Sequence, residues 1–101
     1  MPLKDDSREV LEIQRVRRKI DDIDDKILDL LMERRELAIR VAGMEKEVHL
    51  NDHKKRIKEM LDRIELKADM KGLNGKNVRE FWKALVEYMI HEQKDSEHHF
   101  Y

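Results

Sequence analysis

The stretch that decides the fold is residues 8–48, which read REVLEIQRVRRKIDDIDDKILDLLMERRELAIRVAGMEKEV. It contains no proline and no glycine before Gly43, and strong helix formers dominate it, so we expect one long helix. Apolar side chains recur along it at steps of three and four residues, the a/d spacing of a helix that packs against another helix. We name this series the apolar seam; its members are Ile13, Val16, Ile20, Ile23, Ile27, Leu30, Leu37, Val41, Met44 and Val48.

Arg34 interrupts the apolar seam between Leu30 and Leu37. A guanidinium group stays charged at any relevant pH and is costly to bury without an anion. Arg34 therefore requires either a structural carboxylate or an anionic ligand.

The length of the expected helix bears on association. About 40 residues at 1.5 Å per residue extend on the order of 60 Å, whereas a compact domain of this size has a radius of gyration near 13 Å. We therefore expect the helix to project beyond any core that one chain forms, and to bury the apolar seam against a partner chain.

Two shorter helices are expected after the long one, giving helices at about 7–47, 52–69 and 75–95. Asp6 or Ser7 is placed to cap the first helix, and Asn51 or Asp52 the second. Residues 72–75, Gly-Leu-Asn-Gly, are typical of a turn, with the asparagine at the start of the third helix. No strand alternation occurs, so the predicted fold is all-α, in a single domain over residues 1–101.

The third helix is expected to carry an apolar stripe that ends in a polar residue. Four residues beyond Met89 the stripe reaches Gln93, whose amide needs partners if it is buried. The apolar members of the stripe are Val78, Phe81, Trp82, Leu85, Val86, Met89 and Ile90.

The composition argues against several functions. Charged residues make up 45% of the chain, but 22 basic and 23 acidic residues leave a net charge of -1, which gives no field favouring nucleic acid or a membrane. The absence of cysteine excludes disulfides and thiolate metal sites. His49 and His53 have the spacing of a helical metal site but lack an evident third ligand, so no metal is expected. With no spanning segment and no signal peptide, the expected location is the cytoplasm.

Two runs in the first helix, RRKIDDID at residues 17–24 and LLMERRELA at residues 30–38, resemble the all-helical, AroQ-type chorismate mutases. That family has an arginine, then Ile and Asp at the following turns, and then a Leu-Leu-x-Glu-Arg-x-x-Leu-Ala block. The resemblance covers nearly the whole chain, although the second and third helices match mainly by length and pattern. It implies an intertwined homodimer and an isomerase, without cofactor, that converts chorismate to prephenate in the shikimate pathway to phenylalanine and tyrosine.

The implied reaction determines what its pocket must contain. Chorismate carries two carboxylates, which need guanidinium or ammonium partners in fixed geometry. Negative charge grows on the ether oxygen as its C–O bond breaks, so a cation and a hydrogen-bond donor aimed there stabilise the transition state more than the ground state. The reaction requires no metal, nucleophile or proton shuttle.

By position, the resemblance assigns Arg34 to one substrate carboxylate and Arg17 to the other, with Arg17 reaching into the partner subunit's site. It assigns Gln93 to the hydrogen bond with the ether oxygen and Asp52 to the region of the substrate hydroxyl. Lys55 falls where the family usually has an arginine.

The chain departs from the family pattern at the cation that faces the ether oxygen. Glu45 occupies that lysine position, and the adjacent Lys46 is turned by about 100° around the helix, so only a local irregularity near Gly43 would bring it inward. Arg56 stands where glutamate is usual, and Met89 where a small polar residue is common.

Two interpretations of this departure are open. In the first, Arg56 or Lys46 supplies the positive charge and activity survives. In the second, Glu45 and Arg56 form a salt bridge, and the chain is a weak or silent helical dimer that serves as a regulatory or interaction module.

The predicted function is that of a chorismate mutase. An isochorismate pyruvate lyase of the same fold is the enzymatic alternative, because it also needs a cationic pocket for a dicarboxylate. The residues predicted to be catalytic are Arg34, Gln93, Arg56 and Lys46, and those predicted to bind substrate are Arg17, Arg34, Asp52, Lys55, Glu45 and Met89.

Overall fold

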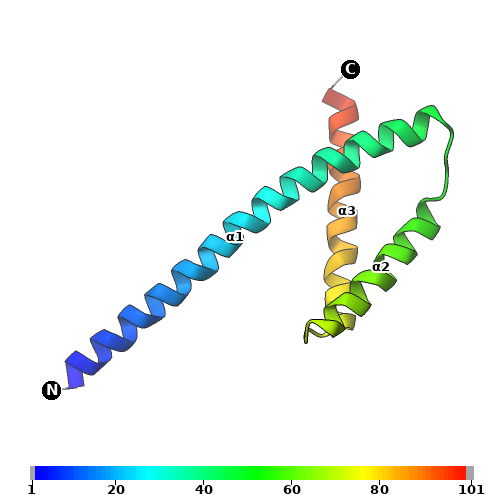
Figure 1. Cartoon of the computed structure of the whole chain (residues 1–101). Coiled ribbons are helices and arrows are strands. Elements are labelled where there is room, and N and C mark those ends of the chain that lie inside the picture. The colour runs from blue at the N-terminus through cyan, green and yellow to red at the C-terminus, as the bar shows by residue number, and fades with distance from the viewer. Residues whose placement is uncertain (1, 100–101) are drawn as a thin grey trace. The chain divides into compact units, whose positions relative to one another are not determined.

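The computed structural model describes residues 2–99 and, within them, the side chains of residues 7–95. Its helices are α1 (Pro2–Glu47), α2 (His53–Met70) and α3 (Gly75–His99), and residues 2–99 contain no strand. Figure 1 shows the long α1 followed by the two shorter helices. The prediction of an all-α fold with one very long and two shorter helices is therefore confirmed.

Helix α1 begins earlier than expected and continues without interruption to its end. It starts at Pro2, so Asp6 and Ser7 lie within the helix and not at its N-terminus. Proline suits a first helical position, because its φ is already helical and it has no N–H to leave unpaired. The helix also runs through Gly43, and Lys46 is exposed, so the irregularity that would bring Lys46 inward is not formed.

Both helix ends that lead into a connection are closed by the same backbone motif. The N–H of Leu50 donates to the carbonyl of Glu45 at 2.9 Å and His49, at φ 57°, takes the left-handed position. At the end of α2 the N–H of Leu73 donates to the carbonyl of Ala68 at 3.0 Å, with Gly72 at φ 82°. These are Schellman motifs, in which a residue of positive φ allows the last carbonyls of a helix to be satisfied.

The chain divides into two compact units, residues 1–34 and residues 35–101. The described part of the first unit is the portion of helix α1 up to Arg34. Every side chain from Ser7 to Leu30 is exposed, and the apolar seam members of this unit range from 45% exposed at Val16 to 61% at Leu30. The first unit therefore has an apolar face that its own residues leave uncovered.

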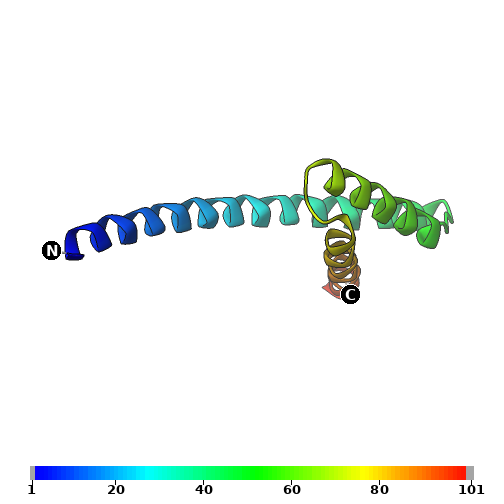
Figure 2. The same ribbon diagram turned by 90° about the horizontal axis from the view of Figure 1, so that it is seen from below.

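The second unit contains the end of α1, all of α2 and α3. Helices α2 and α3 pack together and converge at the turn that joins them (Figures 1 and 2). Their buried apolar residues form a small core, namely Leu61, Ala68, Val86 and Met89. Phe81 belongs to the apolar stripe of α3 by spacing but is 68% exposed, so the stripe is wider than the surface that α2 covers.

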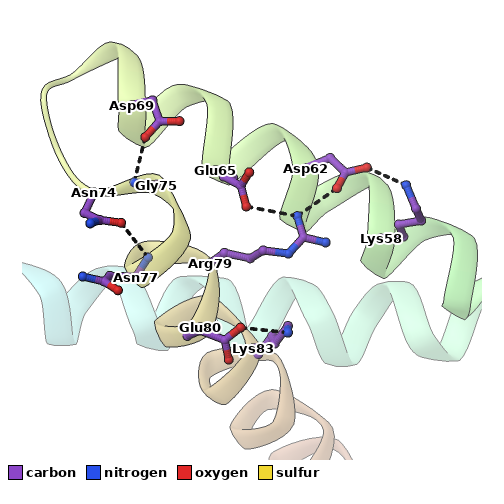
Figure 3. A network of polar contacts seen from close by, with 10 residues as sticks. All are labelled: Lys58, Asp62, Glu65, Asp69, Asn74, Gly75, Asn77, Arg79, Glu80 and Lys83. Atoms are coloured by element: carbon purple, nitrogen blue, oxygen red, sulfur yellow. Dashed lines mark hydrogen bonds and ion pairs between the residues drawn. The ribbon is translucent and has the colours of Figure 1, made fainter.

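Polar contacts fix the start of α3 against α2 (Figure 3). The side chain of Asn74 accepts a hydrogen bond from the N–H of Asn77 at 3.1 Å, so Asn74 caps α3 as its position in the sequence predicted. The carboxylate of Asp69 accepts the N–H of Gly75 at 2.8 Å. A Cβ at Gly75 would lie 2.6 Å from the carbonyl oxygen of Glu65, so glycine is required for this close approach.

Arg79 links the same two helices further along. Its guanidinium lies 2.8 Å from an oxygen of Asp62 and 3.6 Å from an oxygen of Glu65 (Figure 3). Lys58 contacts the other oxygen of Asp62 at 2.8 Å. The hydrogen bonds from Lys58 and Arg79 hold the pKa of the Asp62 carboxyl below its usual value.

Candidate active site

Gln93 forms a contact between α3 and the end of α1. Its side chain is half-buried, and its Nε2 donates a hydrogen bond to the backbone carbonyl of Ala38, 3.4 Å away. One turn earlier on α3, Met89 is 3% exposed and belongs to the core. The polar residue that ends the apolar stripe therefore lies on the packed side of α3, in the second unit.

The hydrogen-bonding capacity of Gln93 is only partly used by this contact. A glutamine amide has two N–H donors and a carbonyl acceptor, and one N–H is directed at Ala38. The carbonyl of Ala38 has two lone pairs, so it can accept this bond in addition to its bond within the helix. One of the two N–H groups of the Gln93 amide is therefore held by the carbonyl of Ala38.

Beside Gln93 lies a charged group, centred on Glu92, that the sequence pattern did not reveal. The carboxylate oxygen Oε1 of Glu92 accepts a hydrogen bond from the hydroxyl of Tyr88 and lies 3.5 Å from a guanidinium nitrogen of Arg35. This hydrogen bond raises the pKa of Tyr88 and lowers the pKa of Glu92. The spacing of Tyr88 and Glu92 is visible in the sequence, but the contact with Arg35 depends on tertiary packing.

Glu45, at the family's lysine position, is paired with a histidine. Its carboxylate lies 3.7 Å from Nε2 of His53, the first residue of α2, and its side chain is only 12% exposed. The pair is ionic when the imidazole is protonated. The salt bridge between Glu45 and Arg56 that the sequence suggested is not formed among the described residues, because His53 at the start of α2 takes that place.

The other residues expected near this connection are exposed. Asp52 caps α2 through its backbone carbonyl, which accepts the N–H of Arg56 at 3.0 Å, while its side chain makes no cap hydrogen bond. Lys46, Lys55 and Arg56 are exposed on the last turn of α1 and the first turn of α2. The second unit thus holds three cationic side chains around one connection, and within residues 7–95 no hydrogen bond or ion pair joins them to Gln93.

The two arginines assigned to the substrate carboxylates belong to the first unit. Arg17 is exposed on α1, next in sequence to Val16 of the apolar seam. Arg34 is half-buried and is the last residue of that unit. It precedes Arg35 directly in the chain, so one turn of α1 carries both the expected substrate arginine and the arginine that meets Glu92.

No group of three or more His, Cys, Asp or Glu side chains in the described part is arranged to hold a metal ion. No helix in the same part is long and apolar enough to cross a membrane.

A three-helix fold with an arginine in the seam of its long helix and a half-buried glutamine on its third is the arrangement that the resemblance to the all-helical chorismate mutases led us to expect. The sequence profile of chorismate mutase type II matches residues 16–94, which include every residue expected at the site. The chain belongs to this family. Neither the curated proteins nor the solved structures contain a significant match to the chain.

Proposed function

We propose that the protein is a chorismate mutase that converts chorismate to prephenate. The observation that carries the proposal is the half-buried Gln93, held on the packed face of α3 by its hydrogen bond to Ala38, in a chain of the chorismate mutase type II family. An amide donor at this place would meet the ether oxygen as its charge develops, which favours the transition state over the ground state.

In this proposal the arginines orient the substrate and the amide acts on the breaking bond. Arg34 and Arg17 hold the two carboxylates, and each guanidinium offers two parallel N–H groups to one carboxylate. Holding both carboxylates keeps the flexible substrate in the compact conformation from which the rearrangement occurs. The bound substrate has therefore already lost the conformational entropy that would otherwise form part of the barrier. Asp52 and Lys55 contribute hydrogen bonds at the hydroxyl side of the ring.

Arg56 is the proposed source of the positive charge at the ether oxygen. The carboxylate of Glu45 is paired with His53, so it does not neutralise Arg56 in the described structure. Arg56, on the first turn of α2, and Lys46, on the last turn of α1, are both exposed, and Arg56 has the longer side chain. This arrangement supports the first of the two interpretations, in which activity survives the change at Glu45.

A homodimer is part of the proposal. The six apolar seam residues of the first unit are each about half exposed, and a helix in water depends mainly on burial of its apolar face for stability. Covering the exposed part of six such side chains is worth on the order of 5–9 kcal/mol per chain. A second copy, pairing α1 with α1, would cover this face and bring Arg17 to the partner's site. We also propose the cytoplasm as its location.

The first test is the loss of chorismate absorbance with purified protein, with Arg34→Ala and Arg40→Ala as a matched pair on α1. We expect Arg34→Ala to lower kcat/KM by at least about a hundredfold, because one carboxylate loses its partner. Its Tm should stay level or rise, since a charge leaves the apolar seam. Arg40→Ala, at an exposed position, should leave both unchanged.

The same assay tests whether Arg56 supplies the positive charge at the ether oxygen. Arg56→Ala should lose activity to a similar extent, whereas Arg63→Ala, exposed on the same helix, should not. A folded protein that consumes no chorismate but releases salicylate and pyruvate from isochorismate would be a lyase. A folded protein inactive on both would be a silent module, with Glu45 marking the lost contact.

A further inference from the structure

The contact between α3 and the end of α1 rests on two neighbouring residues. Glu92 meets Arg35 at 3.5 Å, and Gln93 meets the carbonyl of Ala38 at 3.4 Å. Arg35 and Ala38 are three residues apart and so lie on one side of α1. Two adjacent residues of α3 therefore contact two residues that lie one turn apart on α1.

Glu92 is itself held on α3. Tyr88, four residues earlier, donates its hydroxyl to the same carboxylate oxygen that faces Arg35. The side chains of Arg35 and Glu92 are 40% and 25% exposed, so this group lies at the edge of the packed region. An ion pair as exposed as this one adds little to stability, but it orients both partners, because one oxygen receives two donors from fixed directions.

We infer that Glu92, held by Tyr88 and Arg35, is a positioning residue that aims the amide of Gln93 at the substrate. This inference rests on the proposed function. The hydrogen bond to Ala38 fixes one N–H of the amide, but its 3.4 Å length is at the weak end for an N–H to carbonyl contact. The ion pair of Glu92 with Arg35 is the second contact between α3 and α1, and it prevents α3 from rotating away from α1. Arg35 also neutralises the carboxylate, which would otherwise oppose negative charge on the ether oxygen.

The kinetic test uses Glu92→Gln, which removes the charge and preserves the size of the side chain. We expect kcat to fall roughly ten- to a hundredfold, as for a misplaced catalytic group, with KM within about twofold. In a Gln93→Ala background the same substitution should cause no further loss, because it acts through Gln93. A purely structural role would lower Tm and reduce the rate by the same factor in both backgrounds, which would overturn the inference.

The matched control is Glu80→Gln, which removes the same charge from an exposed ion pair of α3, with Lys83 at 2.9 Å. It should change neither kcat nor KM. Tyr88→Phe is the second variant, and its loss in kcat should not add to that of Glu92→Gln, because both remove the same support.

A substrate-free measurement separates this inference from the proposed function. In the full-length protein, the side-chain amide resonances of Gln93 should be shifted from those of a free glutamine and slow to exchange with solvent. Both properties should decrease in Glu92→Gln and stay unchanged in Glu80→Gln. If the wild type consumes no chorismate, the proposed function fails, and the amide resonances still decide whether Glu92 positions Gln93. Resonances that are the same in wild type and Glu92→Gln would refute the inference.

Discussion

Asp62 makes the stability of the contact between α2 and α3 depend on pH. Its two oxygens face Lys58 and Arg79, each at 2.8 Å, and these partners favour the ionised carboxylate. The pKa of Asp62 in the folded chain is therefore below its unfolded value, which is near 3.9 for an aspartate. The stabilisation is present above about pH 3.9 and is lost as the pH falls through the folded pKa.

The pH dependence of this stabilisation predicts how Asp62→Asn should behave. We expect its Tm at pH 7 to be about 1–3 °C below that of the wild type, since the pair is exposed. The difference should shrink as the pH falls below 4 and through the folded pKa of Asp62, because the wild-type carboxylate then becomes protonated as well. Thermal unfolding between pH 7 and pH 2 measures it. Glu59→Gln on α2 is the control, and a gap that persists at pH 2 would contradict the assignment.

At the scale of the elements, the helices are separated by the backbone geometry of their ends. The left-handed His49 and Gly72 close α1 and α2, and the side chain of Asn74 opens α3. Gly75 then admits the backbone of α2 at a distance that no side chain would tolerate. The packing of α2 on α3 therefore depends on a glycine at the first position of α3.

Two glycine substitutions should have opposite effects on stability. Gly75→Ala should lower the free energy of unfolding by about 1–3 kcal/mol, because the added methyl group meets Glu65 and Asp69. Gly43→Ala should raise it by about 1 kcal/mol, because Gly43 lies within α1 and has nothing within 4 Å of an added Cβ. Urea unfolding of both variants measures the pair. Equal effects would show that the close approach at Gly75 is not formed.

At the scale of the whole molecule, the exposed apolar seam points to a second copy of the chain. We expect a sedimentation mass of twice 12.3 kDa at micromolar concentration. Ile23→Asp, in the middle of the seam, should dissociate or unfold the protein, because a charge would be buried without a partner. Asp22→Ala, its exposed neighbour, should leave the mass unchanged. A wild-type mass equal to one chain would refute the dimer.

The heptad spacing, the absence of helix breakers and the glycine-asparagine turn determined from sequence alone that the chain is all-α with one long and two shorter helices. These features are local, and backbone propensity and periodicity suffice to predict them. The motif around Arg34 likewise identified the family.

The partners of individual side chains were decided only by tertiary structure. Glu45 meets His53 and not Arg56, and Glu92 meets Arg35. Phe81 is exposed while Met89, on the same stripe, is buried. Periodicity places a residue on a face of its helix but does not say which neighbour covers that face, because this depends on where the helices cross and on which side chains of the second helix reach the crossing.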